Sequence, residues 1–381
     1  MRVLHVIANL LPEKGGPPRT AIEMCQQLAA AGCSVSLFSG DSGEPSRMPG
    51  AIPGVDLRIF ETRWRRWGWS PAMAAALNST AADYDVIHIH SVFLHHTLAA
   101  AAAARRAGVP YLIRPHGSFD PWLRRRGRIK KWVYNTLLEQ QVLDGAAAIH
   151  YTTEAEKDLA HTAMGIRAPA VVIPLGIDTE LRSRLPPRNI ARALWNIPLH
   201  QHVVLFLGRL DAKKGLDLLI AAFARAKRDV PTLHLLIAGP ESPQYTGVVD
   251  RELRKANIES STTLTGMVEG EQKLAALAAA DVFVLPSYTE NFGLAVVEAM
   301  GAGVPVVVSN AVNTSDVIIQ HNAGWVTTHD TDEISAAILC ALRNPLEARA
   351  RATRAQDLVV GQFTWAMTAA RLHAYYETLV A

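Results

Sequence analysis

The sequence predicts an α/β protein that is built from two parallel, doubly wound sheets. Short apolar runs of strand length alternate with helical stretches, and this alternation occurs in two successive series along the chain. Strands that alternate with helices favour parallel sheets with helices on both faces. At 381 residues the chain is also longer than one hydrophobic core usually supports. We therefore expect two domains.

The first series predicts a domain of residues 1–185. It opens with a buried strand, then a loop that contains Gly15 and Gly16, then a helix that reaches residue 31. Glycines allow a tight turn with close backbone approach, and proline is well tolerated at a helix start. Residues 176–198 are rich in proline and arginine, as is typical of a connector. The expected strands are residues 2–8, 34–38, 86–89, 111–113, 147–150 and 171–174.

The second series predicts a domain of residues 186–362, followed by a C-terminal helix within residues 363–381. Helices are expected near residues 330–343 and 346–360, and residues 364–379 form the closing helix because they carry an aromatic and aliphatic stripe. The expected strands are residues 203–207, 234–238, 262–264, 282–285 and 304–308.

Composition excludes several classes of protein. No run of about twenty apolar residues exists, so we expect no transmembrane helix. The N-terminus is interrupted by His5 and reaches a polar loop too early for a secretory signal. The cysteines, Cys25, Cys33 and Cys340, lack metal-binding spacing and cannot make a disulfide framework, which indicates a reducing cytoplasm. The net charge of +3 is mild.

The most informative stretch is residues 286–308, which predicts a strand end, a loop, a helix and the next strand. Glu290 precedes the helix, and Glu298 lies within it, eight positions further on. The helix would begin near Phe292 and Gly293, where unpaired backbone N–H groups suit a phosphate or sugar oxygen. Glu298 could accept two hydrogen bonds from vicinal hydroxyls such as those of a ribose. The alternative is an ordinary amphipathic helix with two solvated glutamates.

A basic loop opens the second series. A strand delivers Gly208 and Arg209 to the carboxyl edge of the sheet, where open α/β folds bind ligands, and Lys214 follows five residues later. A guanidinium and an ammonium at this edge can clamp a diphosphate leaving group. Alone, such a loop is more often a solvated surface, and the neighbouring Lys213 is expected to be solvated.

These two elements together resemble the retaining glycosyltransferases of family 4. Glu290 and Glu298 match the E-x-x-x-x-x-x-x-E motif of that family, and residues 208–215 match its G-R-x-x-x-x-K-G element. The resemblance covers essentially the whole chain and implies the GT-B fold. In that fold two Rossmann-like domains face a central cleft, and the C-terminal helix crosses back to the first domain.

The resemblance also implies roles for the donor-side residues. Arg209 and Lys214 would stabilise the leaving diphosphate, and Glu298 would hold the ribose. Glu290 would orient the transferred sugar together with the backbone around it. The wider donor-binding set is Gly15, Gly16, Gly208, Met267, Val268, Asn291, Phe292, Gly293 and Leu294. For Met267, which follows the strand at residues 262–264, simple core packing is an equal alternative. The family needs no metal, and the substrate would be a UDP or GDP sugar.

The first half would supply the acceptor side and part of the catalytic set. His116 resembles the family's His-Gly segment beside the transferred sugar, where it could hydrogen-bond a hydroxyl; a packed loop histidine is the weaker alternative. Arg19 could reach an anionic acceptor or a phosphate, although a solvated arginine is equally consistent. Ser91 and His95 are expected to line the acceptor side. A zinc site built from His88, His90, His95 and His96 is disfavoured because no carboxylate or cysteine cluster completes it.

Two basic-aromatic patches, residues 63–69 and 122–132, combine tryptophans with arginines and lysines. This composition suits the headgroup layer of an anionic membrane, where lipid-linked acceptors lie. A nucleic acid could bind a surface of the same composition. The glycosyltransferase hypothesis favours the membrane, and we expect no nucleic-acid partner. A plain solvated surface is the other alternative. We thus expect a cytoplasmic enzyme, peripheral on the inner face of the cell membrane.

The predicted function is a metal-independent, retaining hexosyltransferase. It would move a sugar from a nucleotide-diphosphate donor to a hydroxyl of a glycan or lipid-linked acceptor, in the biosynthesis of a surface polysaccharide. One alternative is a nucleotide-sugar 2-epimerase of the same fold, which would use the donor without an acceptor. The other is a membrane-binding or nucleic-acid-binding module with an inactive cleft.

Overall fold

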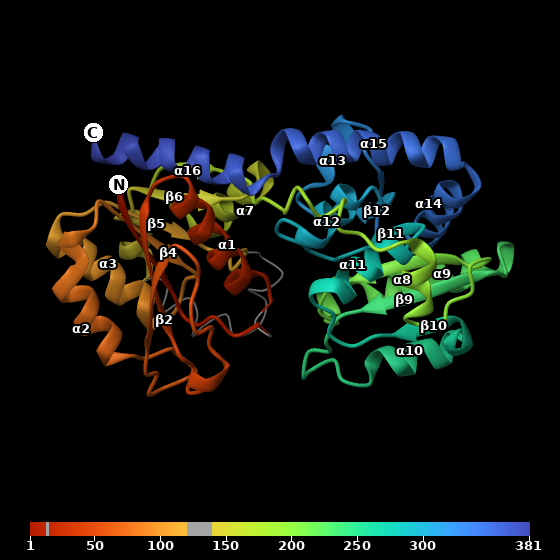
Figure 1. The fold of residues 1–381 in the computed structure, drawn as a ribbon, viewed down its shortest axis with the longest axis horizontal. Helices are drawn as coiled ribbons and strands as arrows, with labels where there is room; N and C mark the ends of the chain where they lie inside the picture. Colours follow the sequence, from red (N-terminus) through yellow and green to blue (C-terminus); the bar gives the residue numbers. More distant parts are fainter. Residues whose placement is uncertain (13–14, 120–138) are drawn as a thin grey trace. The chain divides into compact units, whose positions relative to one another are not determined.

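The chain divides into two compact units in a computed structural model that describes residues 1–12, 15–119 and 139–381 (Figure 1). The first unit is Met1–Gly176 together with Trp365–Ala381, and the second is Ile177–Thr364. The change of unit therefore follows Gly176, earlier than the expected boundary after residue 185. Ile177 already belongs to the second unit because its N–H donates to the carbonyl of Phe363 at 2.8 Å.

The first unit contains one parallel sheet with the strand order β3-β2-β1-β4-β5-β6-β7. Its two central strands, β1 and β4, are buried along nearly their whole length. The strands are β1 (Arg2–Ile7), β2 (Ser34–Gly40), β3 (Val55–Phe60), β4 (Val86–His90), β5 (Tyr111–Arg114), β6 (Ala148–Tyr151) and β7 (Ala170–Val172).

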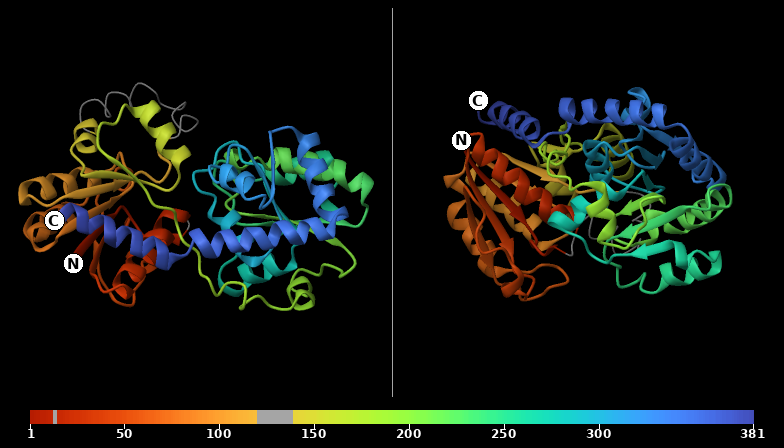
Figure 2. Two further views of the ribbon diagram at one scale, coloured as in Figure 1. Left: turned by 90° about the horizontal axis from the view of Figure 1, so that it is seen from above. Right: turned by 45° about the vertical axis from the view of Figure 1, so that its right-hand side comes forward.

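Helices cover both faces of this sheet. One face packs its apolar residues, such as Leu4, Ile87 and Ile113, into a core with α2, α3, α6 and α7. The C-terminal helix α16 contacts α1 and β4 on the opposite face, and Figure 2 shows it lying across this unit. The helices are α1 (Gly16–Ala30), α2 (Pro71–Thr80), α3 (His95–Ala107), α6 (Gln140–Asp144), α7 (Glu154–Met164) and α16 (Trp365–Val380).

The second unit contains a parallel sheet with the order β10-β9-β8-β11-β12-β13. Its strands are β8 (His202–Leu207), β9 (Leu233–Ala238), β10 (Thr262–Leu264), β11 (Val282–Leu285), β12 (Val306–Ser309) and β13 (Trp325–Thr327). Strand order reverses beside β8, whose neighbours are β9 and β11. Open α/β sheets bind ligands at such a point, beyond the carboxyl ends of the strands.

The helices of the second unit are α8 (Arg188–Ala193), α9 (Leu216–Asp229), α10 (Val248–Ala256), α11 (Gly270–Ala279), α12 (Leu294–Ala302), α13 (Ser315–Gln320), α14 (Thr331–Arg343) and α15 (Pro345–Gln362). Helix α9 packs against α10 and α14, while α12 packs against α11 and α15. None of the helices in the described part of the chain is long and apolar enough to cross a bilayer.

The α/β prediction with two parallel sheets is confirmed, and the structure adds two edge strands that the sequence did not predict. Strand β3 alternates half-buried with exposed residues, including Asp56 and Arg58, so its apolar signal is weak. Strand β13 has three residues. Edge strands are commonly short or charged, because an exposed edge would otherwise pair with another chain.

Candidate active site

The loops after β8 and β9 lie against each other at the carboxyl edge of the second sheet. The N–H of Gly208 donates to the carbonyl of Ala238 at 2.9 Å. A Cβ atom on Gly239 would lie 2.0 Å from the carbonyl oxygen of Gly208, and Gly239 has a φ of 143°. Only glycine permits this approach, so Gly239 helps to place Gly208 and the following Arg209.

The loops after β8 and β11 are held together in the same way. A Cβ atom on Gly215, at a φ of 67°, would lie 2.0 Å from the carbonyl oxygen of Pro286. The N–H of Tyr288 donates to the carbonyl of Lys213 at 2.8 Å. These contacts bring the basic loop to the acidic loop, and the ammonium of Lys214 forms an ion pair with the carboxylate of Glu290. Both side chains are largely buried, with 15% and 13% of their surface exposed.

Glu290 is held on both sides of its backbone and remains ionised. Its N–H donates to the carbonyl of Ala311 at 3.1 Å, and its carbonyl accepts from Asn313 at 3.0 Å. Burial raises the pKa of the carboxyl group, but the charges of Lys214 and Lys213 outweigh burial and leave the pKa below its usual value. A fixed carboxylate of this kind can accept hydrogen bonds from hydroxyl groups.

Helix α12 begins directly after this carboxylate. Its N-cap residue Gly293 has a φ of 73° and no side-chain cap, and its N–H donates to the carboxylate of Glu290. The first N–H groups of such a helix lack intrahelical partners and attract anions and oxygen ligands. Phe292 is buried and packs edge-on against Phe363, with ring centroids 5.6 Å apart. Only its backbone is therefore suited to a ligand contact, whereas Asn291 and Leu294 are half-buried.

Glu298 has a partner that the sequence did not reveal. The ammonium of Lys273, on α11, donates to Glu298 Oε1 at 2.8 Å, and the two side chains are 14% and 4% exposed. Lys273 thus neutralises and orients the buried carboxylate that was expected to hold a ribose. In the sequence Lys273 is one of several polar residues at the start of that helix, before an apolar second half. Such a lysine usually points into solvent.

The remaining donor-side residues are accessible. Arg209 is exposed and makes no hydrogen bond or ion pair with the described residues. Met267 is 43% exposed, so the alternative that it is core packing is wrong. Val268 is half-buried beside it. An exposed apolar side chain beyond a strand end is available to stack against a flat ring.

Strained backbone gathers at the carboxyl edge of the first sheet. Ser91 and Phe93 follow β4 with φ values of 73° and 65°, and His116 follows β5 with a φ of 52°. The N–H of Ser91 donates to the carbonyl of Arg114 at 2.8 Å, which links the two strand ends. Left-handed conformations are unfavourable for such side chains and cluster at functional sites. Ser91 and His116 therefore lie at one edge of the first sheet.

The glycine pair and Arg19 lie at the start of α1. Gly15 is the N-cap with a φ of 85°, and Gly16 is the first helical residue. A Cβ atom on Gly16 would meet no atom of the described residues within 4 Å. Arg19 is exposed, one turn into the helix. Contacts of these residues with a phosphate or an acceptor stay a prediction.

The backbone of His95 is hydrogen-bonded to the first basic-aromatic patch. Residues 63–69 form a tight turn in which Trp64 bridges Trp69, and the N–H of His95 donates to the carbonyl of Trp67 at 3.0 Å. Trp64 and Trp69 are 57% and 38% exposed. The patch is therefore a surface feature with two protruding indoles. The second patch, residues 122–132, lies outside the described residues.

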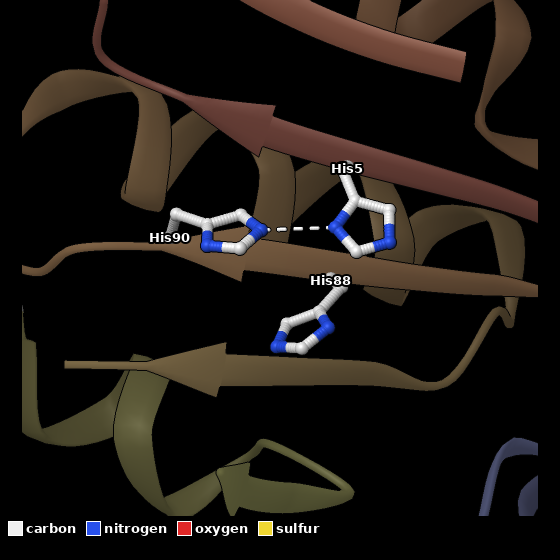
Figure 3. Close-up of side chains that lie close together, drawn as sticks. All are labelled: His5, His88 and His90. Carbon is white, nitrogen blue, oxygen red and sulfur yellow. Dashed lines mark hydrogen bonds between the residues drawn. The ribbon is translucent and has the colours of Figure 1, made fainter. Parts of the chain in front are cut away.

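The buried histidine cluster differs from the set of four histidines that the sequence analysis considered as a zinc site. His5, His88 and His90 are fully buried on β1 and β4, and their nearest ring nitrogens lie within 4.8 Å of one another (Figure 3). His95 and His96 are not part of it. His96 instead hydrogen-bonds the carbonyl of His90 through Nε2 at 2.6 Å.

Comparison with known proteins matches both halves of the chain to one class of enzyme. Residues 187–357 match the family model "Glycosyl transferases group 1", and residues 15–176 match "Glycosyl transferase 4-like domain". A glycogen synthase of Mycobacterium tuberculosis is 29% identical over 96% of this chain and 92% of its own length. A D-inositol 3-phosphate glycosyltransferase of Mycolicibacterium smegmatis is 28% identical over 96% of this chain and 86% of its own length.

Solved structures share the fold. Sucrose-phosphate synthase from Thermosynechococcus elongatus superposes with a TM-score of 0.82 at 22% identity, covering 100% of this chain and 99% of that chain. Anabaena HepE in complex with UDP and glucose gives a TM-score of 0.79 at 20% identity, over 99% of this chain and 100% of that chain.

Proposed function

Because the chain belongs to the family 4-like, group 1 glycosyltransferases, we propose that it moves a sugar from a nucleotide-diphosphate donor to a hydroxyl group with retention of configuration. The observation that carries this proposal is the pair of buried carboxylates at one edge of the second sheet. Glu290 pairs with Lys214, and Glu298 pairs with Lys273. Two preformed, charged acceptors on one helix and its entry loop suit a ligand with two sets of hydroxyl groups.

The donor is proposed to bind the second unit along α12. Glu298, oriented by Lys273, accepts hydrogen bonds from the ribose hydroxyls. Glu290 and the backbone N–H groups at the start of α12 hold the transferred sugar. Arg209, exposed and without a partner in the described residues, binds the diphosphate, and Met267 with Val268 borders the base.

Lys214 is proposed to serve both the sugar and the leaving group. In the structure its ammonium neutralises Glu290, so neither charge is buried alone. An ammonium group has three donors, and one bond to Glu290 leaves others for a phosphate oxygen. As the bond to the diphosphate breaks, negative charge grows on that oxygen, and a fixed cation stabilises this charge most in the transition state.

Retention of the anomeric configuration is proposed because neither buried carboxylate is free to act as a general base. An inverting transferase needs a general base on the face opposite the leaving group, whereas Glu290 is paired with Lys214. We propose that the acceptor oxygen attacks the anomeric carbon on the face from which the diphosphate leaves. The bond from carbon to the phosphate oxygen breaks, and that oxygen takes the proton of the acceptor hydroxyl. His116 contributes a hydrogen bond to the transferred sugar, with Ser91, His95 and Arg19 on the acceptor side.

The donor class is proposed from the relatives, and the acceptor class from the sequence. HepE was solved with UDP and glucose, so UDP-hexoses are the first donors to test, with GDP-hexoses second. The glycogen synthase and the inositol-phosphate enzyme act on acceptors rich in hydroxyl groups, according to their names. A glycan or lipid-linked acceptor in surface polysaccharide synthesis is our proposal for this chain, and no metal cofactor is required.

Stabilisation by nucleotide sugars, followed by product analysis, tests this function. A donor that binds only the folded protein raises the melting temperature, and the Glu298→Ala variant should lose that shift. Proton NMR of the product from an α-linked donor should show an α-linked anomeric centre. A β-linked product would overturn retention, and release of sugar and nucleotide without an acceptor would indicate an epimerase instead. Absence of any donor binding would overturn the transferase proposal.

Membrane contact through residues 63–69 is a separate part of the proposal, supported by the exposed Trp64 and Trp69. Indoles and arginines favour anionic headgroups, and salt weakens the ionic part. Flotation with anionic vesicles should recover the protein, and the Trp64→Ala/Trp69→Ala double variant should reduce recovery. The proposal fails if the protein floats equally poorly with anionic and neutral vesicles.

A further inference from the structure

The first unit buries a polar layer on one face of its sheet, and this layer reaches His116. In the strand register His5 lies beside His88, and His90 lies beside Arg114. Neighbouring residues on these strands, such as Leu4 and Ile89, belong to the apolar core of the opposite face. Side chains alternate between the faces of a strand, so the histidines and Arg114 share the other face.

All the histidines of this layer are neutral. Burial first, and the charge of Arg114 second, lower the pKa of His5 and of His150 to about 3. Burial also holds the pKa of His88, His90 and His116 well below the ordinary value. A neutral imidazole has one N–H donor and one bare nitrogen. In each hydrogen bond between two rings, one ring therefore donates and the other accepts. A ring that accepts through one nitrogen must donate through the other, so the direction of one bond determines the direction of the next.

In the first chain of hydrogen bonds, the donors and acceptors can be assigned by starting from a backbone carbonyl group. The oxygen of Ile173 can only accept, so His150 donates to it from Nε2 at 2.9 Å. The bare Nδ1 of His150 then faces His88 Nε2 at 3.4 Å and accepts from it. His88 Nδ1 is therefore bare and accepts from the hydroxyl of Tyr376 at 2.6 Å. This chain ties α16 to β4 and β6.

The second chain runs from His5 through His90 to His116. His5 Nδ1 lies 2.9 Å from His90 Nε2, and His90 Nδ1 lies 3.1 Å from His116 Nε2 (Figure 3 shows the first of these bonds). His5 Nε2 is buried and has no hydrogen-bond partner among the described residues. A proton there would make a buried donor without an acceptor, which is rarer and costlier than an unpaired acceptor. The positive charge of Arg114 likewise favours a bare nitrogen on His5.

From this geometry we infer that His5 and His90 hold His116 as the tautomer with its proton on Nδ1. His5 donates from Nδ1 to His90, and His90 donates from Nδ1 to His116 Nε2. His116 Nδ1 has no partner among the described residues, so its N–H is available to donate to a sugar hydroxyl and cannot act as a base. His5 and His90 are positioning residues. The sugar contact rests on the proposed function, whereas the tautomer does not.

The same bonds argue against a metal ion at His5, His88 and His90. Both ring nitrogens of His88 and both of His90 already serve these hydrogen bonds. A guanidinium among the same side chains would also repel a cation in a medium of low dielectric constant. The cluster is therefore a hydrogen-bonding device rather than a metal centre.

Histidine-selective ¹⁵N labelling of the full-length protein tests the tautomer directly. Long-range proton–nitrogen correlation spectra distinguish a ring protonated on Nδ1 from one protonated on Nε2. The His116→Gln spectrum identifies the His116 signals by their loss. We expect Nδ1 protonated and Nε2 bare. The opposite pattern in the wild-type protein, or a mixture of the two, would overturn the inference without bearing on transferase activity.

A matched pair of variants at His5 tests the direction of the chain. Asparagine places an amide N–H near the position of His5 Nδ1 and can still donate to His90, whereas aspartate can only accept. His5→Asn should keep the His116 tautomer, and His5→Asp should move the proton of His116 to Nε2. With donor binding retained, His5→Asp should lower kcat roughly tenfold, as expected for one lost hydrogen bond, with little change in the KM for the donor. An unchanged tautomer in a folded His5→Asp protein would overturn the relay.

Discussion

The two sheets share a parallel, doubly wound topology but place their polar groups differently. In the second unit the central strands β8, β11 and β12 are almost wholly apolar, and the charged residues of the site lie in the loops and helices that follow them. In the first unit the polar groups lie inside, where His5, His90 and Arg114 share one buried face.

This difference separates two ways of building a site. The second unit builds its site from two short loops and one helix, which carry Lys214, Glu290 and Glu298. The first unit distributes its polar layer over four strands and α16, so no segment contains it. Burying such a layer is unfavourable unless its members bond one another. We therefore expect acid to lower the stability of the first unit. In the second unit we expect the replacement of single charged residues to lower activity.

The largest expected effect is acid destabilisation of the first unit. The folded pKa of His5 and His150 is about 3, below an unfolded value near 6.5. The unfolded chain thus binds the extra protons, and stability that is complete above pH 6.5 is lost as pH falls toward 3. At pH 5 each of the two histidines should remove roughly 2 kcal/mol. Hydrogen exchange between pH 7 and pH 5 measures this loss in peptides from β1, β4 and β6.

The second unit is the internal control for that experiment. The lowered pKa of Glu290 also makes the folded protein less stable in acid, but this contribution to stability is lost only below about pH 4.5. The pKa of His234 is also lowered, by burial and by the charges of Lys227 and Arg192. Peptides from β8 and β11 should therefore change less than those from β1 and β4. Equal loss of protection in both units would show that the histidine layer is not the sensitive element.

The second prediction concerns the cations beside the diphosphate. Arg209→Ala and Lys214→Ala should each lower kcat by roughly 10²–10³-fold, the effect of removing one donor to a developing charge. Lys214→Ala should also raise the pKa of Glu290, because burial then acts with less opposition. Steady-state kinetics over a range of pH measures both effects. Lys213→Ala, which changes the adjacent lysine, is the matched control and should retain most activity.

The sequence predicts much of the second unit and less of the first, for physical reasons. Glu290 and Glu298 were found because a motif of nine residues contains both, and Lys214 was found because it belongs to a second short motif, residues 208–215. Lys273 was missed because its bond to Glu298 joins two helices, and sequence spacing does not show which helices pack together. A short sequence pattern therefore predicts the part of a site that one loop or one helix supplies.

The polar layer of the first unit was missed for a related reason. His88 and His90 were noticed as alternating residues, but their partners His5 and His150 lie on other strands and were not connected with them. The alternation itself was the available signal, because a fully buried parallel strand normally reads as a continuous apolar run. The apolar core and the closing helix were predictable because they depend on periodicity alone.

The third prediction tests the pair that joins α11 to α12. Glu298→Ala should weaken the use of the donor by roughly 1.5–3 kcal/mol, the value of a hydrogen bond to a charged group. Lys273→Met should act in the same direction, because it leaves the carboxylate buried without its cation. The specificity constant for the donor measures both. Glu271→Ala, an exposed change on the same helix, should have no effect, and normal donor use by folded Glu298→Ala would exclude the ribose role.

The smallest expected effect returns to the first unit, at the contact between α16 and β4. Tyr376→Phe removes the hydroxyl that donates to His88 Nδ1 at 2.6 Å and leaves a buried nitrogen without its donor. Such a loss should cost about 1–2 kcal/mol of unfolding free energy, measured by urea denaturation with a probe in the first unit. Tyr375→Phe is the matched control, because that half-buried hydroxyl has no partner among the described residues. Equal stability of the two variants would mean that α16 is held by apolar packing alone, through residues such as Leu372, and that the histidine chain ends at His88.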